Sequence, residues 1–308
     1  YPDLSQGAFR QAAASAENKL SGGAFVTPEN VLGGNGASEL IMGIIRLINP
    51  KKVLLPTPCF YGYFHGIRSF GDITEVKYPL REEEGFALRE DFLGAIDENV
   101  DLVILGNPNN PNGRVIPPVL LKKIVEKCKE TGTALLVDEC FLHLSNGGES
   151  AVKYLNSYDR VFVVNAYTKL FSIPGVRVGY VLAAGERIRE LKGVLPEWNM
   201  SVFAQSAGVS CAETILLTDF VEMSVAEIKA LRGRMEQDFR DLGITVYPSD
   251  TNFLLVRSPK NLYHLFLNRE ILIRDCGNFE GLGEGWYRIA VKDEKSYERM
   301  KDCFCFLT

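Results

Sequence analysis

Two cations, Lys169 and Arg177, stand in the otherwise apolar and small-residue segment NAYTKLFSIPGVRVGYVLAA, residues 165–184. A lysine among such neighbours is expected to be desolvated, which favours its neutral amine and makes it a nucleophile toward a carbonyl. The plainer alternative is a lysine whose stem is buried and whose ammonium reaches solvent. The planar guanidinium of Arg177 suits a phosphate. Together the two side chains are interpreted as candidates for binding a carbonyl compound that carries a phosphate.

The segment GGNGASE, residues 33–39, precedes a predicted helix. Its glycines allow backbone amides and the Ser38 hydroxyl to approach an anion at the helix N-terminus. A glycine turn with Ser38 near the helix cap is an equally simple interpretation. The segment is not a P-loop, because it has no GK[ST], and it lacks the strand–GxGxxG–helix order of a dinucleotide site.

Two further polar clusters follow apolar runs. The run NPNNPNG, residues 107–113, has the composition of a plain turn, but its prolines could also hold the Asn110 amide fixed toward a ligand. Asp138 and Glu139 end an apolar run, where a carboxylate needs a partner such as a protonated ring nitrogen. A phosphate cradle, a carboxylate, a lysine and an arginine are the groups that pyridoxal 5'-phosphate requires for its Schiff base, pyridinium partner and phosphate anchor.

Apolar runs alternate with amphipathic stretches between residues 50 and 182. Several runs are rich in Val, Ile and Leu without strict polar alternation, which indicates strands covered on both faces. The predicted strands are 51–56, 72–79, 101–108, 134–139, 160–166 and 177–183, and the predicted helices are 37–48, 61–70 and 118–132. This βαβ series predicts an α/β, three-layer fold with a mostly parallel, doubly wound sheet. Ligands of such sheets bind at the carboxyl ends of strands, so the polar clusters should converge on one crevice.

The pattern changes after Gly185. Long helical segments are predicted at about 185–193 and 201–241, and shorter helices near 259–269 and 293–306. Strand candidates lie within 244–258, 271–276 and 286–291. This half of the chain is predicted to form a smaller α+β lobe.

Composition excludes several function classes. The 308 residues are 46% hydrophobic, and no window approaches the roughly 18 apolar residues that a membrane helix needs. The net charge of -5, without a Lys/Arg cluster, disfavours nucleic acid and favours a small-molecule partner. Seven scattered cysteines without a CxxC pair indicate reduced thiols in a cytoplasmic protein, and three distant histidines give no metal site. The chain starts at Tyr1 without methionine or a signal-peptide pattern, so an N-terminal segment is expected to be missing.

The ordered motifs GNGASEL, PTPCFYGY, GNPNNPNG, VDECF, YTKLFSIPGVRVGY and YRIAV resemble those of the pyridoxal-phosphate enzymes with the aspartate-aminotransferase fold. The likeness covers nearly the whole chain and is nearest to the histidinol-phosphate aminotransferase branch. It implies that Lys169 forms the Schiff base, that Asp138 pairs with the pyridine nitrogen, and that Asn110 binds the phenolic oxygen. Phe60 matches the aromatic residue stacked on the ring. The residues that match the phosphate cradle are Gly36, Ala37, Ser38, Thr168 and Arg177. Arg288 matches the arginine that binds the substrate α-carboxylate, and Arg274 an arginine that binds the substrate phosphate.

The resemblance also implies an assembly. Tyr1, in YPD, matches a tyrosine that reaches the cofactor phosphate of a neighbouring subunit, so a homodimer with shared active sites is expected. Residues 1–25 are expected to associate with the small domain and the dimer interface, 26–195 to form the large cofactor domain, and 196–308 to form a connecting helix and the small domain. The family carries a further segment before YPD that closes over the substrate.

Within the branch, SIPG and the segment ILIRDCGNFEGLGEGWYRIAV look nearest to threonine-phosphate decarboxylase of cobalamin biosynthesis. Two residues depart from the wider family: Asn112 replaces a threonine, which the turn should tolerate, and Phe141 replaces a tyrosine on the phenolic oxygen. Phenylalanine there also resembles the decarboxylase branch. Three hypotheses stay open: a lyase acting on O-phospho-L-threonine, a transferase of the histidinol-phosphate type using 2-oxoglutarate, and a non-catalytic cofactor-binding protein. A phosphorylated amino acid or amino alcohol is the expected substrate class.

Overall fold

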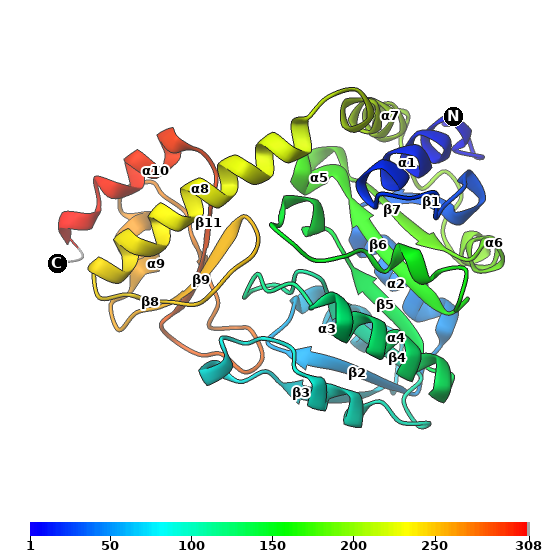
Figure 1. The fold of residues 1–308 in the computed structure, drawn as a ribbon, viewed down its shortest axis with the longest axis horizontal. Helices are drawn as coiled ribbons and strands as arrows, with labels where there is room; N and C mark the ends of the chain where they lie inside the picture. The colour runs from blue at the N-terminus through cyan, green and yellow to red at the C-terminus, as the bar shows by residue number, and fades with distance from the viewer. Residues whose placement is uncertain (307–308) are drawn as a thin grey trace.

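The computed structural model describes residues 1–306, and its larger lobe is built on a seven-stranded sheet in the order β1-β7-β6-β5-β4-β2-β3 (Figure 1). The strands are β1 (Val31–Asn35), β2 (Lys52–Thr57), β3 (Thr74–Pro79), β4 (Leu102–Gly106), β5 (Ala134–Asp138), β6 (Val161–Ala166) and β7 (Val178–Ala183). Strands β2 to β6 run parallel, whereas β7 and β1 are antiparallel to their neighbours. The predicted mostly parallel sheet is therefore confirmed.

Helices cover both faces of this sheet because the strands are apolar on both sides. One face packs against α2 (Ala37–Ile48), α3 (Tyr61–Arg68) and α6 (Gly185–Val194). The other face packs against α1 (Gly7–Leu20), α4 (Pro118–Thr131) and α7 (Val202–Leu217). The result is the expected three-layer arrangement, with a separate apolar core on each side of the sheet.

The amino-terminal part of the chain differs from the expectation. Strand β1 was not predicted, because its two central glycines lower β-propensity. It leads through Gly36 directly into α2, so a strand does precede this glycine segment. Helix α1 packs against α7 and β1 of the larger lobe. Residues 1–25 therefore do not associate with the small lobe as expected.

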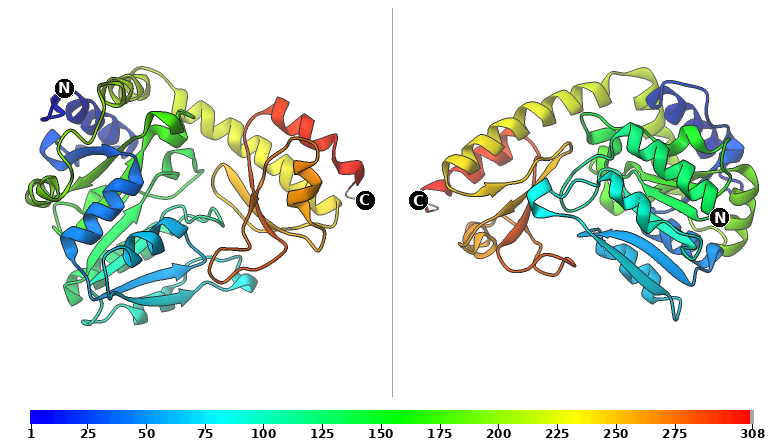
Figure 2. Two further views of the ribbon diagram at one scale, coloured as in Figure 1. Left: turned by 180° about the vertical axis from the view of Figure 1, so that it is seen from behind. Right: turned by 60° about the horizontal axis from the view of Figure 1, so that its bottom comes forward.

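The helix predicted over 201–241 is two helices, α7 and α8 (Phe220–Asp241). They separate at Thr218, whose backbone is extended and whose hydroxyl accepts a hydrogen bond from the Phe220 N–H (3.2 Å). Helix α7 packs on α1, so it lies with the larger lobe although the sequence assigned it to the connecting segment. Helix α8 alone runs from one lobe to the other (Figures 1 and 2).

The smaller lobe contains a four-stranded antiparallel sheet in the order β10-β11-β9-β8. Its elements are β8 (Thr245–Val246), β9 (Phe253–Arg257), α9 (Leu262–Leu267), β10 (Arg274–Asp275), β11 (Trp286–Ala290) and α10 (Glu294–Lys301). A third apolar core lies between this sheet and helices α8, α9 and α10. The predicted α+β lobe is confirmed.

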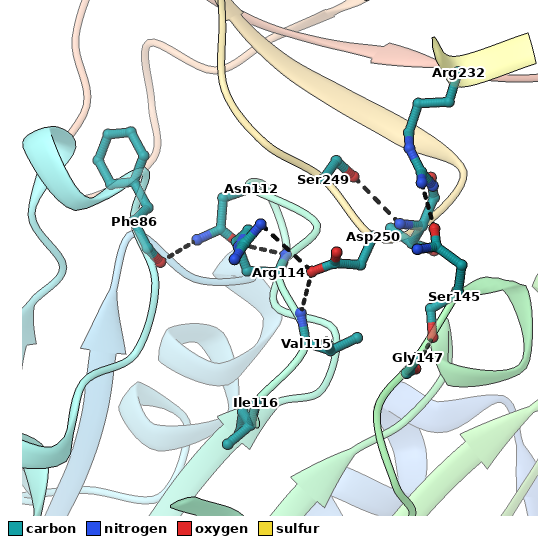
Figure 3. Close-up of polar contacts among 12 residues, drawn as sticks. Phe86, Asn112, Arg114, Val115, Ile116, Ser145, Gly147, Arg232, Ser249 and Asp250 are labelled. Atoms are coloured by element: carbon teal, nitrogen blue, oxygen red, sulfur yellow. Dashed lines mark hydrogen bonds and ion pairs between the residues drawn. The ribbon is translucent and has the colours of Figure 1, made fainter. Parts of the chain in front are cut away.

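The two lobes are joined near Asp250, in the loop between β8 and β9 (Figure 3). The Asp250 carboxylate accepts a hydrogen bond from the Val115 N–H (3.1 Å) and lies 3.7 Å from a guanidinium nitrogen of Arg114. Asn112 is fully buried beside this contact, and its side-chain amide donates to the Phe86 carbonyl (2.7 Å). This loop of the smaller lobe thus holds the loop that also carries Asn110.

Candidate active site

A cavity of about 220 Å³ lies where the carboxyl ends of the parallel strands meet the smaller lobe. It is lined by Ala37, Ser38, Phe60, Tyr61, Tyr63, Pro108, Asn110, Asp138, Cys140, Phe141, Ala166, Thr168, Lys169, Arg177, Arg274, Phe279 and Arg288. Strand ends that are distant in sequence come together here because the strands are parallel and adjacent. The predicted convergence of the polar clusters on one crevice is confirmed.

Lys169 and Thr168 lie on α5 (Tyr167–Leu170), a single helical turn that follows β6 directly. Thr168 is buried, whereas Lys169 is exposed to solvent at the cavity. The expectation that apolar neighbours desolvate Lys169 is therefore wrong for this structure. Those neighbours lie on the opposite side of the short helix, where Tyr167 and Leu170 are buried. The Lys169 Nζ is 5.8 Å from the centroid of the Phe141 ring.

The N-terminus of α2 forms a cationic end of the cavity. No side chain caps its first turn, and Gly36 at the N-cap has φ 79°. The free backbone N–H groups of such a turn, together with the helix dipole, favour an anion. Arg177 lies beside them, and its Nη2 donates to the Asn35 carbonyl (3.4 Å). A Cβ on Gly36 would lie 2.2 Å from that nitrogen, so this glycine makes room for the guanidinium rather than lining the cavity.

Asp138 ends β5 at the floor of the cavity. Its Oδ2 accepts a hydrogen bond from the Tyr63 hydroxyl (2.9 Å), and its Oδ1 accepts one from the Cys140 N–H (3.1 Å). Burial and the neighbouring Asp138 raise the pKa of Tyr63 well above its ordinary value, which keeps the phenol as a donor. Because Tyr63 is fully buried on α3, it fixes the carboxylate from one side.

Two aromatic side chains border this carboxylate. Phe60, immediately before α3, meets the Tyr63 ring edge to face, with centroids 5.5 Å apart and planes at 87°. Phe141 contacts Phe253 of the smaller lobe in the same way, with centroids 5.1 Å apart. A phenylalanine at 141 thus packs across the junction of the two lobes.

The smaller lobe contributes two arginines. Arg274 on β10 is directly opposite Arg288 on β11 in the antiparallel register. Arg288 donates a hydrogen bond to the Oδ1 of Asn110, and its burial lowers its pKa. Arg274 donates to the Oδ1 of Asn278 (2.8 Å) and lies over the ring of Phe279. Two guanidinium groups therefore face the same side of the cavity.

Of the site residues predicted from sequence, Tyr1 and Gly36 are the two that do not line the cavity. Tyr1 is exposed, with its ring 5.1 Å from that of Trp198. Sequence reasoning missed six lining residues, which are Tyr61, Tyr63, Pro108, Cys140, Ala166 and Phe279. The signal for Tyr63 was available, since it lies three residues after Phe60 at the start of a helix, which places both on one face.

Residues 1–306 carry neither a membrane-spanning helix nor a cluster of metal ligands. Within that range, no helix combines the length and apolar character needed to cross a membrane. The same residues hold no group of three or more His, Cys, Asp or Glu side chains that could bind a metal ion.

The sequence model of the family Aminotransferase class I and II matches residues 1–302. The chain is 30% identical over 281 residues to threonine-phosphate decarboxylase of Salmonella typhimurium, covering 88% of this chain and 74% of that protein. It is 31% identical over 287 residues to histidinol-phosphate aminotransferase of Methanopyrus kandleri, covering 88% and 71%. It is also 29% identical over 301 residues to the adenosylcobalamin biosynthesis bifunctional protein CobDQ of Leptospira interrogans, covering 94% of this chain but only 34% of that longer protein.

Comparison with solved structures identifies the fold. The histidinol-phosphate aminotransferase of Clostridium acetobutylicum superposes with a TM-score of 0.86 at 29% identity, covering 99% of this chain and 89% of that one. A Thermus thermophilus aspartate aminotransferase variant superposes with a TM-score of 0.83 at 22% identity, covering 98% and 86%. The fold is that of aspartate aminotransferase.

Proposed function

Because the chain belongs to the class I and II aminotransferase family and is an enzyme of that kind, we propose that its cavity binds pyridoxal 5'-phosphate and acts on a phosphorylated amino acid. Family membership argues against the non-catalytic hypothesis. The cofactor supplies an electron sink for bonds at the substrate Cα. Everything else has to come from the side chains around it.

The residues present fit this cofactor. The uncapped first turn of α2, with Ala37, Ser38 and Arg177, would hold the phosphate, and the clearance at Gly36 supports this assignment. Asp138, fixed by Tyr63, would pair with the ring nitrogen. Four more residues would contact the rest of the cofactor: Phe60 at the ring face, Asn110 at the phenolic oxygen, Thr168 near the phosphate and Lys169 at the carbonyl carbon.

The observation that carries the substrate class is the pairing of Arg274 with Arg288. Two adjacent guanidinium groups match a substrate with two anionic groups, since each guanidinium can form a bidentate contact with a carboxylate or phosphate. O-phospho-L-threonine has both groups, whereas histidinol phosphate has no carboxylate. We therefore infer that the enzyme decarboxylates O-phospho-L-threonine to 1-amino-2-propanol phosphate, as in cobalamin side-chain synthesis.

In this reaction the protein decides which bond at Cα breaks. Arg274 would hold the substrate phosphate, and Arg288 would hold the carboxylate near the Asn110 amide. These two contacts would orient the substrate so that the bond between Cα and the carboxylate is the one that breaks. The ammonium form of Lys169 would donate a proton to Cα after carbon dioxide leaves, which returns Lys169 to the neutral amine.

Transamination is the second candidate function. Glutamate also carries two carboxylates, so the same arginine pair could bind it, and the likeness to the Methanopyrus kandleri aminotransferase supports this hypothesis. In that case Arg288 would hold the α-carboxylate so that its bond to Cα stays intact, and Lys169 would remove the Cα proton.

The two functions are separated by one assay of the cofactor-loaded protein. We expect release of carbon dioxide from O-phospho-L-threonine without any keto acid. Conversion of 2-oxoglutarate to glutamate with histidinol phosphate as the amino donor, without release of carbon dioxide from O-phospho-L-threonine, would establish the second function instead.

We also propose a homodimer in a reducing, cytoplasmic setting. Large apolar side chains are exposed near Tyr1: Trp198 contacts its ring, Leu4 lies with Trp198 in one surface pocket, and Val202 and Phe203 begin α7. Exposed apolar residues concentrated on one face are typical of an interface between protein chains. The location is supported by six cysteines that are free thiols, namely Cys59, Cys128, Cys140, Cys211, Cys276 and Cys303.

A further inference from the structure

Glu17 of helix α1 is a buried carboxylate outside the cavity. It is 1% exposed, and its Oε1 accepts hydrogen bonds from the Tyr180 hydroxyl and, at 3.3 Å, from His143 Nε2. The Asn165 side-chain amide lies at a longer 3.5 Å from the same oxygen. Its other oxygen, Oε2, has no hydrogen-bond partner among the described residues. Such an arrangement is costly to bury, which calls for an explanation.

His143 lies next to Glu17, and its Nε2 forms an ion pair with the carboxylate when the ring is protonated. Burial alone would lower the pKa of this histidine, but the adjacent Glu17 raises it above its ordinary value. Within the described residues, His143 is also the only ion-pair partner of Glu17. A buried carboxylate that accepts hydrogen bonds from a histidine and a tyrosine is a rigid acceptor at a fixed position.

The donors around Glu17 lead to the segment that carries Lys169. The Asn165 Oδ1 accepts a hydrogen bond from the Ala166 N–H (2.7 Å), at the N-cap of α5. The ring of Tyr180 is 5.0 Å from that of Tyr167, the first residue of α5. Glu17 is thus connected to the beginning of this helix by a hydrogen-bonded path and by a packed path.

Helix α5 needs such support. A helix of four residues is not stable by itself, because nucleation fixes several residues for the gain of a single hydrogen bond. The direction in which Lys169 points is therefore set by contacts with the rest of the fold. A displacement of about 1 Å at a reacting group can reduce turnover about 100-fold.

We propose that Glu17 is a positioning residue for Lys169: its carboxylate fixes Asn165 and Tyr180, which fix helix α5 and hence the amine at the cavity. The effect of Glu17 on catalysis rests on the proposed function. The effect of Glu17 on the ordering of α5 is independent of the proposed function, so the two effects are tested separately.

The ordering of α5 is tested on the cofactor-free protein by hydrogen exchange of peptides that cover residues 164–171. We expect Glu17→Ala to increase exchange there about 10-fold or more, because the segment opens locally. Ala13→Gly is the matched control, since it weakens α1 at a buried position one turn away without touching the cluster. Equal exchange at 164–171 in Glu17→Ala and Ala13→Gly would overturn the proposal.

Turnover of the loaded enzyme gives the second measurement. We expect Glu17→Ala to reduce kcat about 10- to 100-fold with little change in KM, because substrate binding uses other residues. Glu17→Gln keeps an acceptor oxygen and should recover most of this loss. An unchanged kcat in Glu17→Ala, beside an active wild type, contradicts the positioning role. An inactive wild type contradicts the proposed function instead and leaves the exchange result to decide the inference.

If Glu17→Ala fails to fold, Asn165→Ala serves in its place. It breaks the link to the Ala166 N–H but keeps the buried pair of Glu17 and His143. The same localised increase in exchange is expected. Wild-type exchange in this variant would overturn the hydrogen-bonded path.

Discussion

Arg177, which lines the cavity, and Gly36, which lies against its guanidinium, both have backbone conformations that few residues adopt. Arg177 has φ 58°, in the left-handed region, and Gly36 opposite it has φ 79°. An arginine in this region is strained, and such strain persists only where surrounding contacts maintain it. Here the contacts are those of its guanidinium with the carbonyls of Asn35 and Pro174. Strain at this position is consistent with a site built to hold an anion.

The first prediction concerns Lys169. With pyridoxal 5'-phosphate added, the wild type should show an absorption band at the edge of the visible range. Lys169→Ala should lose this band, and its turnover should fall by a factor of about 10² to 10⁴. Absorption spectra and steady-state rates measure these effects. Lys153→Ala is the control, because Lys153 pairs with Glu149 away from the cavity. A wild type that stays colourless with the cofactor would contradict the proposed binding of pyridoxal 5'-phosphate at Lys169.

The second prediction concerns Arg274. Arg274→Gln should raise KM for O-phospho-L-threonine about 10- to 100-fold, because a charge-assisted hydrogen bond contributes about 1.5–3 kcal/mol. The same variant should leave the weak binding of unphosphorylated L-threonine unchanged. Arg257→Gln, an exposed arginine on β9, is the control. An equal loss with both substrates would show that Arg274 does not bind the phosphate.

The third prediction concerns Glu139, which follows Asp138 but points into the core on the other side of the strand end. Burial raises the pKa of Glu139 to about 8 from its ordinary value of 4.5. The folded state therefore binds this proton more tightly, so the stabilisation is complete below about pH 4.5 and is lost as pH rises toward 8. Between pH 5 and 8, the free energy of unfolding should fall by about 1–3 kcal/mol more in wild type than in Glu139→Gln. Urea denaturation at several pH values measures this. Parallel curves for the two proteins, with Glu149→Gln as the exposed control, would contradict it.

At the scale of elements, helix ends and interiors respond in opposite ways to the same substitution. Helix α4 ends at Gly132, which has φ 73° and whose N–H donates to the Cys128 carbonyl. Helix α8 has Gly233 in its interior, in an ordinary helical conformation with open space where a Cβ would be. The two glycines thus differ in backbone conformation alone.

The fourth prediction compares these glycines. Gly132→Ala should destabilise the protein by about 1 kcal/mol because alanine is strained in the left-handed region. Gly233→Ala should stabilise it by about 0.5–1 kcal/mol because alanine loses less backbone entropy in a helix. Chemical denaturation of both variants measures the difference. Shifts of the same sign would show that packing, not backbone conformation, dominates at one of these positions.

At the scale of the whole molecule, the cavity exists only where the two lobes meet. Asn110 comes from the larger lobe and Arg288 from the smaller one, and they are hydrogen bonded to each other. The contacts of Asp250 keep the loop of Asn110 against the smaller lobe (Figure 3). The separation of the two guanidinium groups from Lys169 is therefore set by the packing of one lobe on the other.

The fifth prediction concerns assembly. Phe203 is 83% exposed at the start of α7, so Phe203→Asp should convert the proposed dimer to a monomer by placing a charge in an apolar interface. Sedimentation equilibrium measures the mass. Leu272→Asp, at a residue of the smaller lobe that is 74% exposed, should leave the mass unchanged. A monomeric wild type would contradict the proposed homodimer.

The sequence by itself determined the elements of the sheet from β2 to β7, because all but the half-exposed edge strand β3 are short apolar runs whose burial depends on local composition. It also determined which residue types line the cavity, since Asp138, Lys169 and Asn110 stand at the ends of such runs. The sequence did not predict β1, because its two glycines interrupt the apolar run. It also did not predict the break between α7 and α8, where the Thr218 hydroxyl accepts a hydrogen bond from the Phe220 N–H.

Only the tertiary structure decided the remainder. That Lys169 is exposed, that Tyr63 binds Asp138, and that Arg274 pairs with Arg288 each depend on contacts between segments far apart in the chain. The network around Glu17 is the clearest example, because it joins α1 to β6, β7 and the loop after β5. Local propensity carries no information about such contacts, since they form only when separate elements pack together.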